Sequence, residues 1–189
     1  MIRIGILGDI GSGKTYVAKN FGYPVFNADH EVAQLYQNDR NIFNKLKIQL
    51  PKYIHSFPIE KKEVSNAILS NKKNLKKIVK IVHFEIRKKL NNFIKSNKHK
   101  KIVILDIPLL LENKINKKKD ILVFVQSKKS EIIKRLKKRK NFNKKLLKKF
   151  KEIQLPLNFK KKKSHFIIKN NFTKKSIKDA IKGILKEIK

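Results

Sequence analysis

The sequence lacks cysteine and has few acidic residues and no long hydrophobic segment. The absence of cysteine excludes disulfides, thiolate metal sites and thiol nucleophiles. No apolar run approaches the roughly 20 residues of a membrane-spanning helix. The chain opens with a strand-like segment at 2–7 whose apolar stretch is too short for a signal peptide. We therefore expect a cytoplasmic protein with no membrane partner.

The charge of the chain is one-sided, with 49 Lys and Arg against 14 Asp and Glu and a formal net charge of +35. Such a surface attracts polyanions through counterion release, so nucleic-acid binding is one interpretation. Base-composition bias is another, because lysine, asparagine and isoleucine are all abundant here and all have AT-rich codons. The phenylalanines are scattered and form no stripe suited to stacking bases. We expect no specific nucleic-acid partner.

Short apolar segments of β-rich composition alternate along the chain with longer segments of helical periodicity. The predicted strands are 2–7, 24–28, 102–106, 121–126 and 165–168, and the predicted helices are 14–21, 30–36, 74–95, 130–139, 144–153 and 174–188. The alternation favours a parallel sheet, and strands without polar interruption are typical of sheets covered on both faces. We predict an α/β fold with a five-stranded parallel sheet and helices on both faces.

The segment between the first strand and the first helix matches the P-loop pattern G-x-x-x-x-G-K-[ST]. Its glycines let successive N–H groups turn inward around phosphate oxygens, and the helix start adds a positive dipole end. Lys14 would bind the β- and γ-phosphates of ATP, and the Thr15 hydroxyl would ligate Mg²⁺. A turn that only links strand to helix is the alternative. The residues predicted to bind nucleotide here are Gly8, Asp9, Ile10, Gly11, Ser12, Gly13, Lys14 and Thr15.

Two carboxylates follow predicted strands at the sheet edge where open α/β folds bind ligands. Asp29 follows the second strand and could accept the proton of an attacking hydroxyl. Capping of the next helix is the alternative for Asp29. Asp106 ends the third strand, resembles a Walker B aspartate and could hold Mg²⁺ through water, although strand-end aspartates are also common in structural turns.

Several motifs taken together resemble the dephospho-CoA kinase family over nearly the whole chain. They are Ile10 to Lys14, Asn27-Ala28-Asp29, His83-Phe84-Glu85-Ile86-Arg87, Asp106 to Glu112, Arg135 to Arg139, Gln154-Leu155-Pro156 and Asn170. Members of that family transfer the γ-phosphoryl group of ATP to the ribose 3′-hydroxyl of dephospho-CoA, with Mg²⁺ as the metal. The resemblance implies the same reaction here, with Asp29, His83, Arg87 and Asp106 on the acceptor side and Asn170 on the nucleotide.

Three positions depart from the family pattern. Asn27 replaces the first acid of Asp-Ala-Asp, Phe84 replaces the proline after His83, and Asp9 replaces the second loop glycine. Asn27 leaves Asp29 as the only carboxylate of its pair, which favours Asp29 as the base. Asp9 would repel phosphates unless its side chain points outward.

Arginine is rare in this lysine-rich chain, so its positions suggest bidentate anion binding. Arg135 and Arg139 are four residues apart, hence on one helix face, in a segment that the resemblance makes a lid over ATP. Arg135 would bind nucleotide, and Arg139 would neutralise charge on the transferring phosphoryl group. Arg87, near His83, would hold acceptor phosphates. Solvated helix charges, and a packed histidine, are the alternatives.

The predicted organisation is a single P-loop kinase domain acting as a monomer. Its core would be 1–35, 101–130 and 164–189, with a helical acceptor-binding insertion at about 36–100 and a lid at about 131–163. Catalysis would depend on Lys14, Asp29 and Arg139. Another P-loop nucleoside or nucleotide kinase, or a nucleic-acid-binding P-loop protein, would share the loop and differ in acceptor-dependent ADP release or in salt-resistant nucleic-acid binding.

Overall fold

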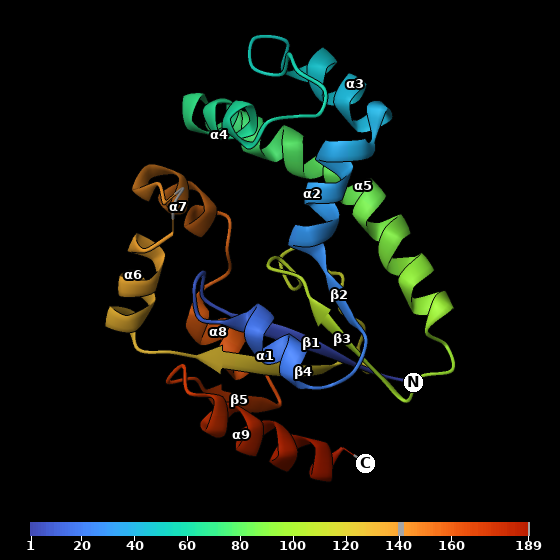
Figure 1. Ribbon diagram of the computed structural model, residues 1–189, viewed down its shortest axis with the longest axis vertical. Helices are drawn as coiled ribbons and strands as arrows, with labels where there is room; N and C mark the ends of the chain where they lie inside the picture. Colours follow the sequence, from blue (N-terminus) through green and yellow to red (C-terminus); the bar gives the residue numbers. More distant parts are fainter. Residues whose placement is uncertain (140–141, 189) are drawn as a thin grey trace. The chain divides into compact units, whose positions relative to one another are not determined.

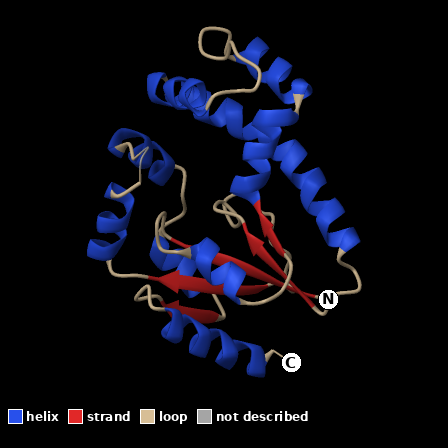
Figure 2. Cartoon of the chain, viewed as in Figure 1, coloured by secondary structure: helices blue, strands red, loops and turns tan. Residues whose placement is uncertain are grey.

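The computed structural model describes residues 1–139 and 142–188, and within them five strands form one parallel sheet (Figures 1 and 2). The strands are β1 (Ile2–Gly8), β2 (Val25–Asn27), β3 (Ile102–Asp106), β4 (Ile121–Gln126) and β5 (Phe166–Lys169). Their order is β2-β3-β1-β4-β5, and every neighbouring pair is parallel. The predicted five-stranded parallel sheet is confirmed.

The three central strands are almost entirely buried, which explains why their sequences are apolar throughout. Ile4 and Ile6 of β1 share a core with helices α1 (Lys14–Asn20) and α9 (Lys174–Glu187). Gly5, between them, faces the other way, where a Cβ would lie 2.5 Å from Cδ2 of Leu110. The sheet is therefore packed against side chains on both faces.

Seven further helices are present in the described residues. They are α2 (Ala28–Asn38), α3 (Arg40–Gln49), α4 (Lys61–Ser70), α5 (Lys72–Ser96), α6 (Lys129–Lys137), α7 (Lys144–Glu152) and α8 (Leu157–Lys162). The six predicted helices are present with ends shifted by a few residues, whereas α3, α4 and α8 were not predicted. For α3 a signal exists, because the Asp39 side chain accepts a hydrogen bond from the Ile42 N–H at 3.0 Å as an N-cap.

The chain divides into two compact units. The sheet unit comprises Met1–Asn27, Ser96–Phe142 and Gln154–Lys189, and the helical unit comprises Ala28–Lys95 and Asn143–Ile153. In the sheet unit, α8 packs against β1. In the helical unit, α4 packs against α7 and α2 against α3. The domain boundaries inferred from the sequence stay a prediction.

The long helix α5 carries the apolar stripe of the helical unit. Its buried apolar residues recur every three or four positions, at Leu75, Ile78, Val82, Ile86 and Leu90. Among the described residues, neither α5 nor any other helix is long and apolar enough to cross a membrane.

Candidate active site

The loop between β1 and α1 adopts a conformation that requires glycine. Gly13 is the N-cap of α1 with φ 91°, and Gly11 has φ 86°, both in the left-handed region. A Cβ on Gly13 would collide with Nδ2 of Asn170. A Cβ on Gly11 would lie 3.0 Å from Cγ of Leu136, so α6 packs directly on this loop. Sequence reasoning did not foresee that contact, because it joins residues far apart in the chain.

Lys14 begins α1, and its side chain turns back over the loop. Its Nζ donates to the carbonyl oxygen of Asp9 at 2.8 Å and to that of Gly8 at 3.3 Å. The Asp9 carboxylate accepts from the Ile10 N–H at 2.7 Å through Oδ1. The loop thus holds one ammonium group close to its main chain, and the Asp9 side chain is bonded to the loop itself.

Ser12, fully buried in the loop, is held by residues that follow β4 and β5. Its carbonyl oxygen accepts from Asn170 Nδ2 at 2.8 Å and from Ser127 Oγ at 2.9 Å. The oxygen of the same side-chain amide, Asn170 Oδ1, accepts a hydrogen bond from the Phe172 N–H at 2.7 Å. Asn170 therefore clamps the loop, and its predicted contact with nucleotide stays a prediction. Ser127 was missed because a serine after a strand carries no distinctive signal.

Asp106 lies at the carboxyl end of β3 and is 3% exposed. Its Oδ2 accepts from Thr15 Oγ1 and from Asn27 Nδ2, each at 2.6 Å. Asn27 is also the register partner of Asp106 on β2. The structure thus brings together the two predicted metal-binding residues, and Asn27 donates a hydrogen bond where a second carboxylate would repel Asp106.

The two predicted lid arginines differ in their surroundings. The guanidinium of Arg135 lies 4.2 Å from the ring centroid of Phe172 in a cation–π contact. Phe172 is itself hydrogen-bonded to Asn170, which holds the loop. Arg139 lies beyond the end of α6 at Lys137, so the expected shared helix face for the two arginines is wrong. Both side chains are exposed. The predicted lid at 131–163 also includes residues 140–141, which lie outside the described residues.

Asp29, His83 and Arg87 belong to the helical unit. Asp29 is exposed in the first turn of α2, which begins at Ala28, earlier than predicted. It is therefore not the N-cap. His83 and Arg87 are one turn apart on α5. Burial, and then the charge of Arg87, lower the pKa of His83, so its imidazole is neutral at pH 7.

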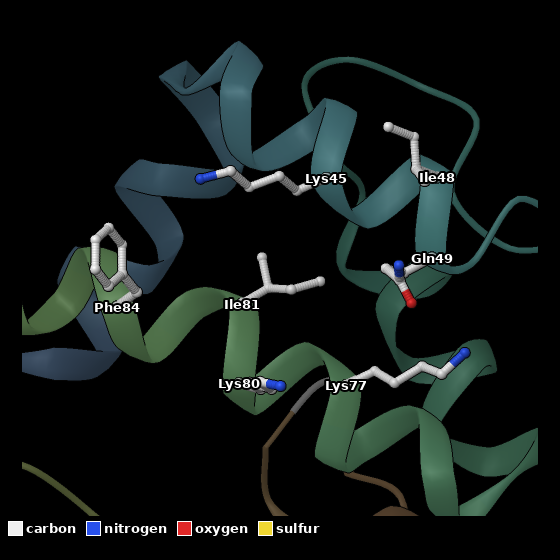
Figure 3. A pocket seen from close by; sticks show the side chains of 7 residues that line it. All are labelled: Lys45, Ile48, Gln49, Lys77, Lys80, Ile81 and Phe84. Carbon is white, nitrogen blue, oxygen red and sulfur yellow. The ribbon is translucent and has the colours of Figure 1, made fainter.

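The helical unit also contains a pocket of about 580 Å³ between α3 and α5 (Figure 3). It is lined by Lys45, Ile48, Gln49, Lys77, Lys80, Ile81 and Phe84. Ile81 points toward α3, and the Lys45 side chain extends toward Phe84. The predicted acceptor residues His83 and Arg87 are not among the lining residues.

The loop after β1 requires glycine, Lys14 donates to its main chain, and Asp106 accepts a hydrogen bond from Thr15. On a parallel sheet, these features together define a P-loop phosphotransferase fold. The family model described as dephospho-CoA kinase matches residues 2–176. The chain belongs to the dephospho-CoA kinase family, and the resemblance found in the sequence is confirmed.

Individual relatives agree with this assignment. A dephospho-CoA kinase of Wolbachia sp. subsp. Brugia malayi (strain TRS) is 34% identical over 187 residues, covering 96% of this chain and 95% of the relative. A crystal structure of a Thermus thermophilus protein, TT1252, has a TM-score of 0.78 at 26% identity and covers 100% of this chain and 98% of its own. A dephospho-CoA kinase structure from Campylobacter jejuni has a TM-score of 0.60 at 23% identity, covering 98% and 96%, and supports the fold.

Proposed function

We propose that this chain binds Mg²⁺–ATP on the loop Gly8 to Thr15 and transfers the γ-phosphoryl group to the ribose 3′-hydroxyl of dephospho-CoA. The observation that carries the proposal is the 2.6 Å hydrogen bond between Thr15 and Asp106 at the end of a loop that also holds Lys14. It places a hydroxyl, a carboxylate and a cation at one edge of the sheet. Family membership supports ATP and dephospho-CoA as the two substrates.

The donor set at this edge fits Mg²⁺. Thr15 and Asp106 offer only oxygen atoms, which this cation prefers. Among the described residues no group of three or more His, Cys, Asp or Glu side chains gathers to hold a metal. The remaining ligands would be phosphate oxygens and waters, as is usual for nucleotide-bound Mg²⁺, with Asp106 acting through water. The ion would neutralise phosphate charge during transfer.

The chain's own residues would then divide the work of the reaction. Asp29 would take the proton of the 3′-hydroxyl as the new bond from that oxygen to Pγ forms and the bond from Pγ to the β-bridging oxygen breaks, releasing ADP. Lys14 and Arg139 would stabilise the negative charge on the transferring group. Arg135, stacked on Phe172, would hold the nucleotide.

The acceptor would be bound through a cation and a neutral ring. Arg87 is exposed and always charged, so it can pair with the acceptor's phosphates. His83 is half-buried and uncharged at neutral pH, so it would shape the acceptor pocket without adding charge. Both substrates are small molecules, so the reaction requires neither a membrane nor a nucleic acid.

The test is ADP release measured with dephospho-CoA and with a panel of nucleosides and nucleotides as acceptors. We expect release with dephospho-CoA to exceed that with any other acceptor by at least about 100-fold in kcat/KM, since lost acceptor contacts reduce transition-state stabilisation. Equal or faster release with a nucleoside would show that the chain is another P-loop kinase.

A further inference from the structure

Among the described residues, Lys160 is the only buried lysine, and every other lysine there lies at least partly in solvent. Its side chain is 1% exposed, and its Nζ lies 2.6 Å from Oε1 of Glu112, which is 8% exposed. Lys160 is part of α8, which packs against β1. A buried ammonium group needs such a partner, because an unpaired buried charge is strongly unfavourable.

The same carboxylate oxygen also holds the main chain. Oε1 of Glu112 accepts from the Leu155 N–H at 2.9 Å. Leu155 lies in the return segment, residues 154–156, where the chain re-enters the sheet unit after the segment Asn143–Ile153. Glu112 therefore holds the chain at two successive places, at Leu155 in the return segment and at Lys160 in the helix α8 that follows it.

Glu112 is itself held in the sheet unit by the turn that follows β3. Leu110 of that turn fills the space over Gly5 of β1, and the Ile115 carbonyl oxygen accepts from Arg3 Nη2 at 3.4 Å. The turn begins directly after Asp106, the residue bonded to Thr15. The carboxylate that holds the return segment is thus six residues from the carboxylate at the proposed magnesium site.

Stability alone does not explain this pair. A buried ion pair is often no better than a well-packed apolar pair of the same size. Moreover, Glu112 Oε2 is buried and has no hydrogen-bond partner among the described residues, which adds a desolvation cost. What the pair provides, and an apolar pair would not, is a directional acceptor at a fixed place for the Leu155 N–H.

We propose that Glu112, together with Lys160, is a positioning residue for phosphoryl transfer, because it fixes the return segment against the turn that begins at Asp106. The segment Asn143–Ile153 is joined directly to the return segment and belongs to the predicted lid. The inference rests on the proposed function.

The test compares two double variants in which both buried charges are removed. Glu112→Gln with Lys160→Met keeps an oxygen acceptor for the Leu155 N–H, whereas Glu112→Leu with Lys160→Met removes it. Lys162→Met, which alters an exposed residue of the same helix, is the control. The measurements are Tm, the Kd for ATP, and kcat with dephospho-CoA.

We expect both double variants to melt within about 5 °C of the wild type, because neither leaves a buried charge unpaired. The Gln variant should keep kcat within about twofold, whereas the Leu variant should lose about tenfold in kcat with its Kd for ATP almost unchanged. If Glu112 had only a structural role, the two double variants would have the same kcat whenever their Tm values were equal. A folded Leu variant with wild-type kcat would overturn the proposal, as would a matching loss of kcat in the Gln variant.

If the Leu variant does not fold, amide hydrogen exchange in the wild type decides. The proposal requires the Leu155 amide to exchange at least about 100-fold more slowly than an unstructured amide, since it is bonded in a buried site. Exchange of the Leu155 amide at the rate of an unstructured amide would refute the proposed role of Glu112 in holding the return segment. Failure of the proposed function would be distinguishable, because the wild type itself would then release no ADP with dephospho-CoA.

Discussion

Replacing Lys14 with alanine is expected to lower kcat/KM by about 10³-fold, because the variant lacks the ammonium group that would stabilise charge on the transferring phosphoryl group. The fold should survive. Lys14 is partly exposed at the start of α1, and its Nζ donates to the loop carbonyl oxygens of Gly8 and Asp9. Steady-state ADP release and circular dichroism measure the two effects.

Lys19→Ala is the matched control, since Lys19 lies in the last turn of the same helix and is exposed. It should keep wild-type turnover. Substantial residual activity in a correctly folded Lys14→Ala protein would refute the phosphate role of Lys14.

Replacing Asp29 with asparagine is expected to slow the transfer step by about 10²–10⁴-fold, the usual contribution of a general base. Nucleotide affinity should change little, because asparagine has the same shape and only the proton acceptor is lost. Single-turnover transfer and a separate ATP titration distinguish the two quantities.

Glu31→Gln is the control for Asp29→Asn, because Glu31 is the other acidic residue in the first turn of α2. Its ion pair with Lys89 at 3.0 Å is partly solvent-exposed and contributes little to stability. If Asp29→Asn weakened ATP binding and transfer equally, Asp29 would have a structural role at the helix start, and the base assignment would fail.

The sheet and the loop were predictable because their signals are local. An apolar run such as Ile102 to Leu105 is typical of a strand buried on both faces. A P-loop is recognised from residues that are neighbours in the sequence. The helices that were missed have weaker local signals. α8 has only six residues, and three of them are lysines that read as solvated charge.

The contacts that were missed are tertiary. The sequence placed Asn170 near the nucleotide only by resemblance and gave no sign that its amide holds the Ser12 carbonyl oxygen. Nor does a run of four lysines at 160–163 reveal that the first is buried against Glu112. Such partners depend on how distant segments pack, which neither periodicity nor composition encodes.

The high charge of the chain bears on how any of these measurements must be made. At +35 the protein will attract ATP non-specifically at low salt, because long-range attraction is poorly screened there. Moderate ionic strength weakens the attraction between exposed lysines and ATP much more than hydrogen bonds from the loop N–H groups to a bound phosphate. Specific binding is therefore distinguished by its persistence as salt is raised.

Nucleotide binding by the loop Gly8 to Thr15 is tested most directly by titrating ATP into the purified protein at moderate ionic strength, with and without Mg²⁺. We expect saturable binding with one ATP per chain that depends on Mg²⁺ and is strongly weakened by Lys14→Ala. Binding that does not saturate, or that is unaffected by both Mg²⁺ and the loss of Lys14, would contradict it.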